Sequence, residues 1–185
     1  MSFISNAVRR FKQDEKGSVI VEAVMVVPML AWAYAGLFSY WDAYRSINTV
    51  QKAAYTISDL ISRSQGSVDD AYIAGIRDTM NYMLGSEEAG QIRVTSYRWS
   101  DVDGAYSVIF SRSPNEAMPQ LTDADLAALT ARLPVLADGD AAVLVEAHVP
   151  YTAPIAFGVA PEVIDQFIVT RPRFLPKLCH EAEDC

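Results

Sequence analysis

Two patterns of apolar residues follow one another along the first third of the chain. Between Ser18 and Tyr40 nearly every position is apolar, and Glu22 is the only group expected to be charged at neutral pH. That length suits a helix crossing a hydrocarbon core of about 30 Å at about 1.5 Å per residue. From Tyr44 to Ile61 apolar side chains instead recur every three or four positions, which indicates a helix with one buried stripe. We therefore predict one long helix with an apolar first half and a stalk over residues 41–65.

The remaining pattern alternates between helical and strand spacing. We expect the stalk to end at Gly66 in a left-handed cap, and a second helix to open at Asp69 and stop at Gly85. Period-two alternation on either side of the turn 101–104 indicates an antiparallel hairpin. The later expected elements are a helix over 123–133, a strand over 141–149, a helical stretch over 155–164 and a last strand over 165–171. The fold class is therefore α+β, with the long N-terminal helix packed on a small antiparallel sheet.

The charges on either side of the apolar stretch predict its orientation. Basic residues precede it, and aromatic residues gather toward its far end, as at a membrane–water interface. The positive-inside rule then places residues 1–17 in the cytoplasm, residues 18–40 across the membrane and residues 41–185 outside. A secretory signal peptide is the alternative, because it too has a basic start and an apolar stretch. The stretch is long for that role, and only Ala31-Trp32-Ala33 weakly matches a cleavage site.

Composition narrows the possible chemistry. The 185 residues carry a formal net charge of -8, concentrated after Tyr40, which disfavours nucleic-acid binding because phosphates require a basic face. Nucleophile, zinc-protease and phosphate-loop motifs are absent from the sequence, and neither His148 nor His180 has the spacing of a metal site. We expect no enzymatic activity, no cofactor and no metal.

Glu22 is the residue that the apolar stretch does not explain. A charged side chain at the centre of a membrane helix costs about 2.5–3.5 kcal/mol and is usually retained for a partner. If a peptidase cut after Gly17, Ser18 would carry a new ammonium group, which could pair with Glu22 of a neighbouring subunit. Alternatively, Glu22 reaches the lipid headgroups or is protonated.

Residues 14–23, Asp-Glu-Lys-Gly-Ser-Val-Ile-Val-Glu-Ala, with Pro28 after them, are similar to the N-terminal signature of the type IV pilin superfamily. They resemble more closely the TadE/TadG-like pilus assembly proteins of tight-adherence (Tad) systems, over roughly residues 10–65. The resemblance implies a pilin-like fold, a prepilin peptidase site flanked by Gly17 and Ser18, and an assembly role for Glu22. Without cleavage the same segment would still serve as an anchor.

The resemblance also implies a function and a location. The expected protein is a minor pilin or pseudopilin that takes part in assembling a Tad-type (type IVc) pilus for surface adherence. Its partners would be other pilin and pseudopilin subunits, the pilus assembly platform and the prepilin peptidase. It would cross the bacterial inner membrane once, with the C-terminal domain in the periplasm, or reside in the pilus. The alternative is a bitopic envelope protein whose periplasmic domain senses or binds a ligand.

Two cysteines, Cys179 and Cys185, lie close together at the C-terminal end. Such a pair outside any CxxC pattern suggests a disulfide if that end meets an oxidising compartment. Both thiols could instead be free or bonded to another chain. Type IV pilins often close a C-terminal loop with a disulfide, so the resemblance favours the bridge.

Overall fold

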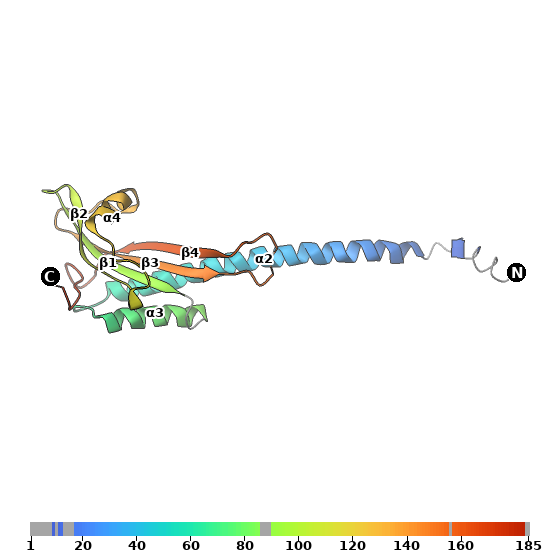
Figure 1. Ribbon diagram of the computed structural model, residues 1–185, viewed down its shortest axis with the longest axis horizontal. Coiled ribbons are helices and arrows are strands. Elements are labelled where there is room, and N and C mark those ends of the chain that lie inside the picture. Colours follow the sequence, from blue (N-terminus) through green and yellow to red (C-terminus); the bar gives the residue numbers. More distant parts are fainter. Residues whose placement is uncertain (1–8, 10, 13–16, 86–89, 156, 184–185) are drawn as a thin grey trace. The chain divides into compact units, whose positions relative to one another are not determined.

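The computed structural model describes residues 9, 11–12, 17–85, 90–155 and 157–183 (Figure 1). The chain divides into two compact units, residues 1–42 with 153–160, and residues 43–152 with 161–185. Helix α2 (Gly17–Ser62) contributes to both units, and each unit is described by itself below. Most of the expected leader, residues 1–17, lies outside the described residues.

The second unit contains a four-stranded antiparallel sheet, which confirms the expected α+β class (Figure 1). The strands lie in the order β2-β1-β3-β4. Their bounds are β1 (Gln91–Ser100), β2 (Ala105–Arg112), β3 (Ala141–Tyr151) and β4 (Glu162–Thr170). The predicted hairpin is β1–β2, whose turn places Gly104 at a φ of 59°, a conformation that favours glycine.

One face of this sheet packs against the stalk part of α2 and against α3 (Asp70–Leu84). The apolar stripe predicted in the stalk is buried there only in its later part, at Val50, Ala54, Ile57 and Ile61. Tyr44 and Ile47, at the start of that stripe, are exposed. Helix α3 begins and ends as its sequence predicts. The Asp69 carboxylate accepts a hydrogen bond from the Tyr72 N–H, and Gly85 adopts the left-handed conformation. The core on this face contains Ile57, Ile73, Met80, Ile92, Val94, Phe110, Val143, Val145, Ala147 and Leu178, among others.

The opposite face packs against α4 (Asp123–Leu129). Arg132, in the 3₁₀ turn η2 (Thr130–Arg132) that follows, lies over the Phe167 ring, 4.0 Å from its centroid. Tyr97 is the largest fully buried side chain here, and burial is the main cause that raises the pKa of its phenol. A capping box begins α4, because the Asp125 carboxylate accepts from the Thr122 N–H and the Thr122 hydroxyl accepts from the Asp125 N–H. The Thr122 backbone N–H is the main cause that lowers the pKa of Asp125.

The structure corrects several expected boundaries. Helix α2 ends at Ser62 rather than residue 65, where the Arg173 N–H donates to the Ser62 carbonyl (2.8 Å) and replaces a helical partner. Gly66 is not among the left-handed residues. The helical stretch expected over 155–164 is not found in its described residues, and β4 already starts at Glu162, where it pairs with the extended end of β3 at Tyr151. The helix expected over 123–133 stops at Leu129 and continues as η2.

Candidate functional site

The N-terminal half of α2 exposes apolar side chains on all its faces. In its most apolar stretch of 18 residues only 6% is buried inside the described chain. By length and composition it is a candidate membrane span, a description that a signal sequence near the N-terminus would also fit. The most exposed of these side chains are Val19, Ile20, Val24, Met25, Met29, Leu30, Trp32, Tyr34 and Leu37.

The structure brings the three predicted processing and assembly residues into the first turns of this helix. Gly17 is its first residue, Ser18 follows, and Glu22 stands one turn further along. Positions four apart share a helix face, so the Glu22 carboxylate and the Ser18 backbone lie on the same side. Glu22 is exposed, and no hydrogen bond or ion pair joins it to another described residue. Among the described residues, this acid therefore stands on an apolar surface without a partner.

Pro28 interrupts the hydrogen-bond ladder of the same segment. It has no N–H, so the Val24 carbonyl loses its usual partner four residues on. Helix α2 nevertheless continues through it. Such a proline is tolerated in membrane helices, where neighbouring groups can satisfy the freed carbonyl.

The C-terminal tail holds Cys179 against the connection between α2 and α3. The Val68 N–H donates to the Cys179 carbonyl (2.9 Å), and the Glu181 N–H donates back to the Val68 carbonyl (3.0 Å). The buried His180 ring lies 3.2 Å, Nε2 to Oδ1, from Asp70. Cys179 is not a free cysteine, but its predicted partner Cys185 lies outside the described residues, so their pairing stays a prediction.

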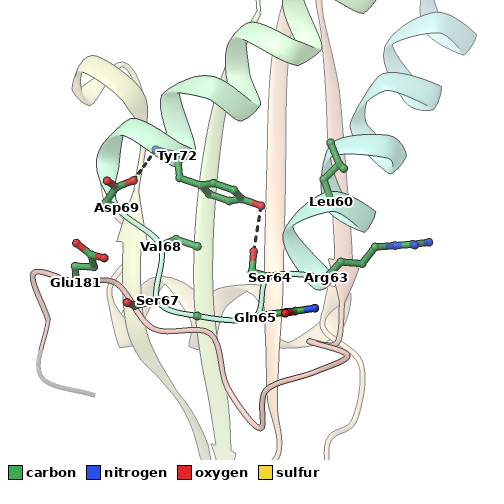
Figure 2. A pocket seen from close by; sticks show the side chains of 10 residues that line it. Leu60, Arg63, Ser64, Gln65, Ser67, Val68, Asp69, Tyr72 and Glu181 are labelled. Carbon is green, nitrogen blue, oxygen red and sulfur yellow. Dashed lines mark hydrogen bonds between the residues drawn. The ribbon is translucent and has the colours of Figure 1, made fainter.

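Beside this tail lies an open cleft of about 400 Å³, lined by the end of α2, the connection and the start of α3 (Figure 2). Figure 2 shows Tyr72 reaching across it to Ser64, with 3.1 Å between the two hydroxyl oxygens. The polar side chains that line it include Arg63, Asp69 and Glu181. These groups are exposed and of both signs, so the cleft selects no particular charge.

We predict that the tail is part of the folded core and not an appendage. Leu178 is fully buried with residues of α2 and α3, so Leu178→Ala should lower the free energy of unfolding by about 3 kcal/mol. Phe174→Ala is the matched control, because Phe174 is exposed in the same segment and its loss should change stability by less than about 0.5 kcal/mol. Urea unfolding of the full chain in detergent micelles, followed by near-ultraviolet circular dichroism, measures both. Equal effects of the two changes would contradict the prediction.

Two features were missed by sequence reasoning. Arg93 and Glu146 form a buried ion pair between β1 and β3, with both side chains 10% exposed. The only sign of this ion pair in the sequence was Arg93, a charged residue on the same face of its strand as Tyr97. Residues 153–160 pack on α2 within the first unit, and their signal was a stretch from 149 to 161 with no charged residue.

Comparison of this chain with protein families, with characterised proteins and with solved structures finds no match.

Proposed function

We propose that this chain is a minor pilin or pseudopilin of a Tad-type pilus system, anchored in the bacterial inner membrane with its second unit in the periplasm. The observation that carries the proposal is the first half of α2, an exposed apolar helix with a single carboxylate near its start. A helix that is apolar on all sides requires lipid or other helices around it. An assembling subunit needs both of these environments in turn.

The proposed mechanism uses the same helix twice. Residues 19–38 hold the subunit in the bilayer and later pack against the corresponding helices of other pilin and pseudopilin subunits. If prepilin peptidase cuts between Gly17 and Ser18, the new ammonium group of one subunit pairs with Glu22 of the next and sets their axial register. Glu22 is exposed and pairs with none of the residues that the structure describes, which supports this role. No cofactor takes part.

An anchor exchange tests the proposal. Residues 18–40 are replaced by an unrelated leucine- and alanine-rich membrane helix of equal length, and the chimera is expressed in a strain from which the gene has been deleted. We expect filaments to be lost while the chimera remains in the membrane fraction, because a passive helix carries neither Glu22 nor the packing surface. Electron microscopy and immunoblotting of sheared filaments measure assembly. Filaments at the level of the unchanged chain would overturn the proposal.

The cleft between α2 and α3 favours a second candidate, a bitopic envelope protein whose periplasmic domain binds a ligand while the anchor is passive. Its open, mixed-charge lining fits a small polar ligand better than an apolar one. Under this candidate the anchor exchange leaves ligand binding by the periplasmic domain intact, whereas Arg63→Ala in the cleft abolishes that binding. Under the first candidate the anchor exchange is the change that abolishes the protein's function, which is filament assembly.

A further inference from the structure

The first unit contains a second apolar element besides the helix. The described residues of segment 153–160 (153–155 and 157–160) form a loop, called loop 153–160 below, that packs on the last turns of the apolar half of α2. The Phe157 ring contacts Trp32 edge to face, with 4.8 Å between ring centroids. Gly36 makes this contact possible, because a Cβ at that position would lie 2.8 Å from the Phe157 ring. The loop and the helix are thus fitted to each other.

The hydroxyl of Ser39, on the helix, connects to the loop through a hydrogen bond to the Ile155 carbonyl. This hydroxyl is fully buried and lies 3.0 Å from the Ala35 carbonyl and 3.1 Å from the Ile155 carbonyl. The Ile155 carbonyl also accepts from the Phe157 N–H at 2.8 Å, and Pro154 has no N–H to satisfy. The loop therefore meets part of its backbone hydrogen-bonding requirement internally, which non-helical backbone in an apolar environment must do.

The position of the contact on the helix sets the depth of the loop. If the hydrocarbon core begins near Ser18, a helix crosses its thickness of about 30 Å by about Leu37. Trp32 comes five residues before Leu37, so it lies about 8 Å inside the far boundary of the hydrocarbon core. A ring that contacts Trp32 then shares its depth. No charged residue lies between His148 and Glu162, in a chain of net charge -8, so no charged side chain in the loop opposes entry into lipid.

We infer that loop 153–160 is a second membrane contact, which enters the lipid interface of the far leaflet beside the last turns of the anchor. The inference rests on the proposal that α2 crosses the membrane. Ile155 is 41% exposed and Trp32 66% exposed, so apolar surface on both elements remains open to acyl chains. Apolar and aromatic side chains at this depth bind the boundary between acyl chains and headgroups. A subunit leaving the bilayer would have to withdraw both elements.

Site-specific photocrosslinking to lipid tests the inference. A benzophenone amino acid replaces Ile155 in the full chain, which is reconstituted into vesicles of phosphatidylethanolamine and phosphatidylglycerol and irradiated. Intact mass spectrometry then reports any adduct. We expect an increase of one lipid mass at Ile155, with a yield comparable to that at Leu30, an exposed position in the middle of the anchor. The matched control is Val102, which is 92% exposed but flanked by Asp101 and Asp103, and should form no lipid adduct.

The three positions separate the possible failures. A lipid adduct at Leu30 but not at Ile155 would overturn the loop contact and leave the anchor in place. An adduct of Ile155 to a second protein chain instead of lipid would overturn it in favour of subunit packing. No lipid adduct at Leu30 would overturn both the membrane span and the loop contact. Because all three positions are exposed, the bulky substitution disturbs no core packing.

Discussion

Replacing Glu22 by glutamine should abolish filament assembly while the chain still inserts in the membrane. Glutamine keeps the shape of the side chain and removes its charge, so the variant tests the charge alone. In the apolar environment between packed helices, an ammonium group left without its carboxylate carries a large desolvation cost, since removing one partner of a buried ion pair costs about 3–5 kcal/mol. Repeated at every subunit contact, that loss is expected to prevent growth. Insertion should improve slightly, because an uncharged residue enters lipid more easily.

Complementation of the deletion strain measures this result. Filaments are counted by electron microscopy, and carbonate extraction of membranes shows whether the variant is inserted. Glu22→Asp is the matched control, since it keeps the charge on a shorter side chain and should retain part of the assembly. A Glu22→Gln chain that assembles at the unchanged level would show that the carboxylate does not set subunit register, and a passive anchor would then be the better description.

Replacing Glu146 by alanine should destabilise the second unit by about 4 kcal/mol. Two nitrogens of the Arg93 guanidinium lie 2.7 Å from one Glu146 oxygen, and a third contact, at 2.6 Å, reaches the Pro119 carbonyl. The substitution removes the carboxylate and leaves the guanidinium buried with only a carbonyl as partner. The same urea unfolding measurement in micelles reports the change.

A double variant separates the contribution of the ion pair from the cost of leaving one buried charge without a partner. Arg93→Met combined with Glu146→Leu removes both charges and keeps most of the volume, so its loss of stability should be much smaller than that of Glu146→Ala alone. The exposed pair between Arg171 and Asp140 provides the surface control, and Arg171→Ala should cost less than about 1 kcal/mol. A double variant as unstable as the single one would mean that the strands need the ion pair itself.

The predicted elements of the fold that are confirmed depend on neighbours within a few residues. Apolar spacing along 18–61 is sufficient to predict α2, because a helix is formed by contacts three and four residues apart. Asp69 and Gly85 bound α3 because caps use only local backbone groups. Alternation on both sides of the Gly104 turn predicted β1 and β2 for the same reason. The lone carboxylate in the apolar stretch was likewise visible in the sequence, and its role in assembly stays a prediction.

Features that join distant segments were decided by the tertiary structure. The end of α2 at Ser62 depends on the Arg173 N–H, and the start of β4 depends on pairing with Tyr151. The short apolar stretch after Pro154 has no period that separates a helix from a packed loop, and its contact with α2 through Ser39 gives it a loop conformation. The partner of Arg93 is 53 residues away, a separation at which no local pattern indicates which side chains meet. The sequence by itself therefore determined that α2, α3 and α4 are helices, where α3 begins and ends, and the hairpin. The end of α2, the sheet order, the ion pair and the loop on the apolar helix required the folded chain.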